Sequence, residues 1–106
     1  MTVEFSEECR KALDELGKAV EDYAKARARL KFLISKITGY PATLPIASLV
    51  SSYRRGRVEF RDKMVCRRGT DECVDFNTLM SAIDEYYSTR SRVNELLKLV
   101  LYECLR

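Results

Sequence analysis

The chain has 106 residues, of which 46% are hydrophobic and 33% are charged, and its formal net charge is +3. This size and composition indicate a single helical-bundle domain over residues 1–106 and exclude a largely disordered chain. No window approaches the roughly 18 apolar residues of a membrane span. The N-terminus has neither a basic region nor an apolar run, so we expect no membrane segment, no signal peptide and a cytoplasmic location.

A first long helix is predicted to begin at Ser6 and to end at Gly39. Ser is a favourable N-cap, and the two glutamates that follow it suit the positive end of the helix dipole. Apolar residues recur with a 4-3 spacing through Ile37, and alanines repeat every seven residues beside them. Gly39 provides a C-terminal cap. This pattern is typical of a helix that packs in a bundle.

A second, kinked helix is predicted over residues 43–64. A 3-4 spacing of apolar residues continues through Gly56, although Gly weakens a helix by about 1 kcal/mol relative to Ala. The alternative is that the helix breaks at Gly56. Residues 57–60 would then form a short strand, followed by a turn at 61–62.

A third helix is predicted to begin at Thr70, as its N-cap, and to run almost to the end of the chain. Its apolar residues keep a heptad rhythm, which Arg90 interrupts. Its C-terminal third is apolar on most sides, and two neighbouring helices cannot bury all of that surface. We therefore expect a homodimer or higher oligomer, with an interface formed by Leu96, Leu99, Leu101, Tyr102 and Leu105.

The predicted fold is all-α, a three-helix up-down-up bundle with two long helices and a kinked middle helix. Short loops favour it, and it gathers the most apolar ends of the helices at one end of the bundle. The alternative is an antiparallel long-helix hairpin with a split middle segment. That registry places Cys9 opposite Cys104 and Arg27 opposite Tyr86, so a disulfide between Cys9 and Cys104 would exclude the up-down-up bundle.

The chain has four cysteines and no histidine. Zinc sites need closely spaced ligands, whereas the nearest two cysteines here are seven residues apart, so no metal site is expected. The up-down-up arrangement favours a disulfide between Cys66 and Cys73 and leaves Cys104 alone. Cytosolic disulfides are rare outside hyperthermophiles. The absence of Gln and the abundance of charge lean towards such a source.

The sequence gives little support for catalysis. Without His, the usual general base and the usual partner of a Ser or Cys nucleophile are absent. No Gly-rich phosphate-binding loop is present either. We therefore expect a protein that is not an enzyme and that carries no cofactor.

The strongest functional signal is the segment 53–68, which holds seven basic and two acidic residues. Its net charge of +5 exceeds that of the whole chain. We predict that the protein binds nucleic acid through largely sequence-independent phosphate contacts. The predicted site residues are Arg54, Arg55, Arg57, Arg61, Lys63, Arg67 and Arg68. The alternative function is a helical assembly or adaptor subunit, a structural component of a larger complex or particle.

Two arginines, Arg27 and Arg90, interrupt the apolar stripes of the two long helices. One interpretation is a polar site for an anion near Tyr23, Tyr86 and Tyr87. The other is a layer of Arg, Tyr and acidic side chains that fixes the register of the helices.

Overall fold

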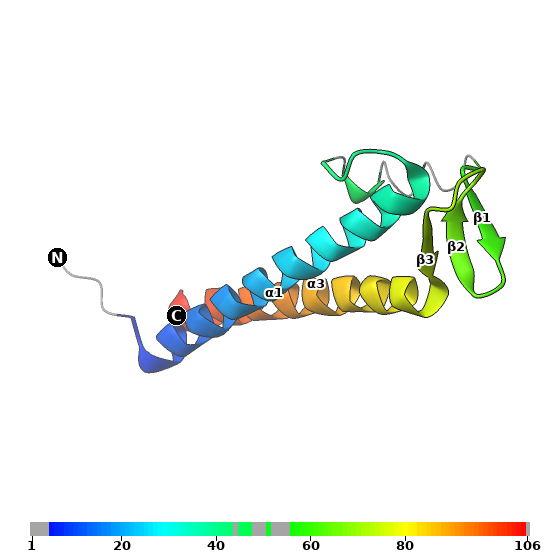
Figure 1. Cartoon of the computed structure of the whole chain (residues 1–106). Coiled ribbons are helices and arrows are strands. Elements are labelled where there is room, and N and C mark those ends of the chain that lie inside the picture. The colour runs from blue at the N-terminus through cyan, green and yellow to red at the C-terminus, as the bar shows by residue number, and fades with distance from the viewer. Residues whose placement is uncertain (1–4, 44, 48–50, 52–55, 106) are drawn as a thin grey trace.

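The computed structural model of the chain describes residues 5–43, 45–47, 51 and 56–105. Within these ranges, two long antiparallel helices form a hairpin, and a small three-stranded sheet stands at one end of it (Figure 1). The elements are α1 (Glu7–Thr38), β1 (Val58–Arg61), β2 (Met64–Arg67), β3 (Cys73–Asp75) and α3 (Phe76–Cys104). The first turn of α1 and the last turn of α3 lie at the end opposite to the sheet (Figure 1).

Local interactions define both ends of α1, as the sequence predicts. The Ser6 hydroxyl accepts a hydrogen bond from the backbone N–H of Cys9 at 3.1 Å, which satisfies one of the free donors of the first turn. At the other end, Gly39 adopts the left-handed conformation at φ 80° and donates its N–H to the Ser35 carbonyl. Gly adopts this conformation without the steric penalty of a side chain.

The sheet is antiparallel, in the order β1-β2-β3. A tight turn joins β1 to β2, with Asp62 at a positive φ of 55°. Its register pairs Phe60 with Val65, and Val65 with Val74 on the next strand. Residues directly opposite each other in antiparallel strands share one face. This face packs against the helices, and it buries Val65 and Val74.

The third strand leads directly into α3. The Asp75 carboxylate caps the helix by accepting hydrogen bonds from the N–H groups of Asn77 and Thr78. The backbone N–H of Phe76 donates to the Lys63 carbonyl at 2.9 Å, which fixes the start of α3 to the turn between β1 and β2.

The two helices pack closely because small residues line their contact. Ala12, Ala19 and Ala26 are buried on α1, and Ala82 is buried on α3. Nearer the sheet, larger apolar side chains lie between the helices and form the hydrophobic core. That core joins both helices to the sheet, and its buried members are Leu30, Ile34, Ile37, Val58, Val65, Val74, Leu79, Ala82 and Tyr86.

The predicted three-helix bundle is wrong. Residues 58–61 and 64–67 form a β-hairpin in place of the second half of a middle helix. Thr70 is not the N-cap of α3, which begins only after Asp75. The Thr70 hydroxyl instead accepts a hydrogen bond from the Glu72 N–H within the turn between β2 and β3. The apolar spacing of this region fits a strand as well as a helix, and contacts with distant residues favour the strand.

The up-down-up direction is also wrong. A disulfide joins Cys9 to Cys104 across 95 residues, so α1 and α3 lie antiparallel and Cys104 is not alone. The apolar C-terminal ends of the two helices therefore lie at opposite ends of the hairpin. The expectation of disulfides itself is confirmed, and a second one joins Cys66 to Cys73 across neighbouring strands.

Candidate interaction surfaces

The structure describes five of the seven predicted nucleic-acid-binding residues, and their side chains differ in exposure and in partners. Arg54 and Arg55 lie outside the described residues. Arg67 is half-buried, and its guanidinium donates a hydrogen bond to the Lys36 carbonyl at 3.1 Å. Carbonyls in the last turn of a helix lack intrahelical partners. Arg67 therefore supports the C-terminal end of α1.

Arg61 is held by an acidic neighbour. Its guanidinium donates two hydrogen bonds to the carboxylate of Glu59 on the same strand. These bonds hold the pKa of the Glu59 carboxyl below its usual value, and the charge of Arg68 acts in the same direction. The negative charge of Glu59 thus offsets part of the positive charge on this side of the sheet.

Three of the predicted residues are exposed and form no ion pair within the described part of the chain: Arg57, Lys63 and Arg68. The backbone N–H of Arg68 donates to the Arg57 carbonyl at 2.8 Å, so these two residues are neighbours. The Arg57 guanidinium lies over the ring of Tyr40, 4.7 Å from its centroid. Lys63 lies at the other end of β1, in the turn before β2. Among the described residues, the exposed basic side chains without an ion pair therefore lie near both ends of β1.

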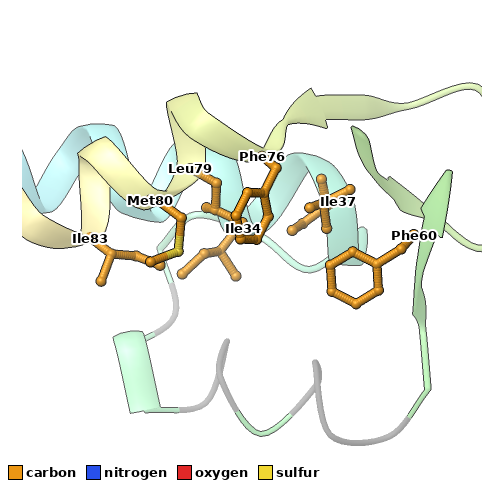
Figure 2. A pocket seen from close by; sticks show the side chains of 8 residues that line it. Ile34, Ile37, Phe60, Phe76, Leu79, Met80 and Ile83 are labelled. Carbon is orange, nitrogen blue, oxygen red and sulfur yellow. The ribbon is translucent and has the colours of Figure 1, made fainter. Parts of the chain in front are cut away.

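An apolar groove lies between the sheet and the two helices (Figure 2). Its volume is about 230 Å³, and every residue that lines it is apolar: Ile34, Ile37, Phe60, Val65, Phe76, Leu79, Met80 and Ile83. Side chains from α1, β1 and α3 turn toward this common space (Figure 2). The Phe60 side chain at its rim is 61% exposed. The groove does not follow from the sequence, because the predicted kinked helix places Phe60 on a helical face and not on a strand that faces α1 and α3.

Two stripes of residues spaced seven apart continue from the groove along the hairpin. The stripe on α1 consists of Ile34, Arg27, Val20 and Leu13, and that on α3 consists of Ile83, Arg90 and Leu97. Seven residues rotate an α-helix by only about 20°, so each stripe stays on one side of its helix. Because Ile34 and Ile83 both line the groove, both stripes lie on its side of the hairpin. We call the groove and these stripes the apolar face.

The predicted oligomer interface is divided by the fold. Leu96 is only 7% exposed and packs inside the hairpin, so it is not available to a partner. Leu99, Leu101, Tyr102 and Leu105 are exposed. Leu99 lies two residues from Leu97, which places it about 200° around α3, away from the apolar face. Leu101 lies one turn beyond Leu97, on the side of the apolar face.

A cluster of tyrosines and arginines lies midway along the apolar face. The hydroxyls of Tyr23 and Tyr86 are 3.5 Å apart across the two helices, and their ring centroids are 5.6 Å apart. Arg27 and Arg90 each follow one of these tyrosines by four residues, on the next turn of the same helix. We call these four residues the Tyr–Arg layer.

The pKa of the Tyr86 hydroxyl depends on its neighbours in the Tyr–Arg layer. The hydrogen bond with Tyr23 and partial burial raise the pKa of the Tyr86 hydroxyl above its ordinary value. The positive charges of Arg90 and Arg27 act in the opposite direction.

The described residues contain no group of three or more His, Cys, Asp or Glu side chains that could hold a metal ion. Neither α1 nor α3 is long and apolar enough to cross a membrane. All four cysteines are in disulfides, so none offers a free thiol.

No family model matches the chain, and comparison with curated proteins and with solved structures found no similar protein.

Proposed function

We propose that this protein is a non-enzymatic structural subunit that assembles with itself through the apolar face. The groove carries this proposal, because every side chain that lines it is apolar and Phe60 at its rim is largely exposed. Monomeric soluble proteins seldom expose large continuous apolar patches, and those that they do expose often mark interaction sites.

A second copy of the chain fits this surface because the two ends of the apolar face have complementary shapes. At the sheet end it is hollowed by the groove. At the other end it carries projecting side chains, of which Val20 and Leu97 are each 46% exposed. Two copies that lie antiparallel would each place the projecting end against the groove of the other. Such an isologous contact closes a dimer and covers both grooves.

Sedimentation equilibrium of the wild-type protein and of a V20S/L97S variant tests this proposal. Both positions are exposed in the single chain, so the substitutions should leave the helical content unchanged in circular dichroism. We expect a wild-type dimer or higher oligomer and an association at least about tenfold weaker in the variant. The matched control is L99S, because Leu99 is 41% exposed on the same helix but lies off the apolar face. A monomeric wild type, or equal weakening by L99S, would contradict the proposal.

A second candidate function is nucleic-acid binding, favoured by the exposure of Arg57, Lys63 and Arg68 without an ion pair in the described residues. Fluorescence anisotropy with duplex DNA and with single-stranded RNA, at low and at raised salt, tests it. In R57A/K63A/R68A the slope of log affinity against log salt should fall by about 0.7–0.9 for each phosphate that the variant no longer neutralises.

The control for this second test is R10A/K11A/K98A, which removes the same charge from exposed positions on the helices. It should bind as tightly as the wild type. No binding of either nucleic acid at low salt would reject this function. Arg54 and Arg55 also remain part of this prediction.

A further inference from the structure

The Tyr–Arg layer has more hydrogen-bond donors than the described residues satisfy. Each tyrosine hydroxyl carries one proton, so in the Tyr23–Tyr86 pair one hydroxyl donates and the proton of the other is left over. Arg27 and Arg90 are exposed, and neither forms an ion pair within the described part of the chain. Each guanidinium adds five N–H donors and no acceptor. The layer therefore offers positive charge and free donors to an acceptor from outside.

On the opposite side of the hairpin, an arginine does have a carboxylate partner. Arg29 lies two residues from Arg27, about 200° around α1. Its guanidinium pairs with the Glu85 carboxylate of α3 at 2.8 Å. The hairpin thus has a cross-helix ion pair on that side. On the apolar face, Arg27 and Arg90 each lie one turn from a tyrosine of the pair, and neither has a carboxylate partner among the described residues.

The antiparallel direction of the helices gives the layer an approximate twofold symmetry. Arg27 lies one turn from Tyr23 towards the sheet, whereas Arg90 lies one turn from Tyr86 away from it. The two arginines therefore lie on opposite sides of the tyrosine pair along the axis of the hairpin. A small ligand that contacts the hydroxyls has a positively charged residue on either side of it along the hairpin.

We propose that the Tyr–Arg layer is a binding site for an oxyanion, either a carboxylate or a phosphate group, which accepts hydrogen bonds from Arg27, Arg90 and a tyrosine hydroxyl. The planar donor fork of Arg matches both groups and binds them bidentately.

The test is an NMR titration of the full-length protein with inorganic phosphate and, separately, with acetate. The signals to follow are the Arg Nε–H groups and the Tyr ring protons. Potassium chloride at matched ionic strength separates site binding from general screening. We expect saturable shifts at Arg27, Arg90 and Tyr86 with at least one of the two oxyanions. Which oxyanion produces them identifies the carboxylate or the phosphate as the preferred group.

The decisive variant is R27M/R90M, which keeps two long side chains in the stripes and removes both charges. Its affinity for the oxyanion should fall at least about tenfold. The matched control is R92M, because Arg92 is exposed on α3 about 200° away from Arg90 and should leave the titration unchanged. The absence of saturable shifts in the wild type, or equal shifts in R27M/R90M, would overturn the proposal. Intact disulfides and helical circular dichroism verify that each variant is folded.

This site does not require the proposed self-assembly, since all four of its residues come from one chain. In the antiparallel dimer proposed above, the two layers would lie close together, because each lies midway along its apolar face. Four arginines would then repel one another, and a bound oxyanion would offset that repulsion. Phosphate should in that case strengthen dimer formation in the wild type but not in R27M/R90M. A monomer that still shows the NMR shifts would reject the self-assembly and leave the anion site standing.

Discussion

The disulfide between Cys9 and Cys104 joins the first turn of α1 to the last turn of α3 and closes the hairpin at the end that has no sheet. Cys66 and Cys73 close a much shorter loop inside the sheet at the other end. Each end of the hairpin therefore has its own covalent link. The two links differ in how strongly they restrict the unfolded chain.

Removal of the long-range disulfide should destabilise the protein more than removal of the short one. Cys9 and Cys104 are separated by 95 residues, and Cys66 and Cys73 by seven. The loop-closure model gives about 4–5 kcal/mol for the longer loop and about 2–3 kcal/mol for the shorter one. Denaturant titration of C9A/C104A and of C66A/C73A measures both free energies of unfolding. A larger destabilisation in C66A/C73A would show that native packing, and not loop length, sets the order.

The glycines inside and at the end of α1 should respond oppositely to substitution by Ala. Gly39 has a φ of 80°, and a Cβ there would lie 3.2 Å from the Arg67 guanidinium carbon. We expect G39A to lower the free energy of unfolding by about 1–2 kcal/mol. Gly17 lies inside α1 with open space around it, so G17A should raise that free energy by up to about 1 kcal/mol. Thermal unfolding of both variants checks the prediction, which fails if both substitutions shift Tm in the same direction.

Close packing of the two helices should make Ala82 intolerant of a larger side chain. Ala82 is fully buried where α3 meets α1, so A82L must displace neighbouring groups. Overpacking of this kind costs about 1–3 kcal/mol. Ala24 is exposed on α1, and A24L should change stability by less than about 0.5 kcal/mol. Urea titration of both variants provides the comparison, and an unchanged midpoint for A82L would contradict the close packing.

Substitution of Tyr23 by Phe should lower the pKa of Tyr86 towards its ordinary value, because the hydrogen bond between the two hydroxyls is the main cause of the raised pKa. The pKa of the Tyr86 hydroxyl is higher in the folded state than in the unfolded state. Tyr86 therefore makes its full contribution to the free energy of unfolding below about pH 10, and this contribution is lost as the pH rises through the folded-state pKa. The alkaline destabilisation attributable to Tyr86 should therefore be smaller in Y23F. An NMR pH titration of the Tyr86 ring measures the shift.

The control for this titration is Y87F. The Tyr87 ring packs against Tyr86 with centroids 5.3 Å apart, so its substitution retains an aromatic contact but no hydroxyl. It should leave the pKa of Tyr86 raised. An equal shift in Y87F would show that loss of a neighbouring tyrosine hydroxyl lowers the pKa whether or not that hydroxyl bonds to Tyr86, and would contradict the assigned cause.

The ends of α1 follow from the sequence because they depend on local interactions. Ser6 accepts a bond from a residue three positions away, and Gly39 bonds one turn back. The amphipathic spacing of both long helices is likewise readable without knowledge of their neighbours. The same reading identifies Arg27 and Arg90 as interruptions of the apolar stripes, which the structure brings into one layer with Tyr23 and Tyr86.

The secondary structure of the middle of the chain cannot be predicted from the local sequence pattern. Phe60 and Met64 are four residues apart, which fits a helical face, but Val58 and Phe60 also alternate as in a strand. Tertiary contacts of Val65 favour the strand. Val65 pairs with Phe60 on one side and with Val74 on the other, and its side chain packs in the hydrophobic core between the sheet and the helices. The charge of segment 53–68 is likewise known from sequence, whereas the attachment of Arg67 to α1 is not.

The sequence by itself therefore determined two long amphipathic helices, the N-terminal and C-terminal caps of α1, and the location of positive charge. The tertiary structure decided the direction of the helices, since the Cys9–Cys104 link and the Arg29–Glu85 ion pair join residues that are far apart in the chain. It also decided that residues 58–61 and 64–67 form strands, since cross-strand pairing and burial against α1 stabilise them there. Local propensity acts over one or two turns, whereas direction, register and the shape of the apolar face depend on contacts that only the folded chain creates.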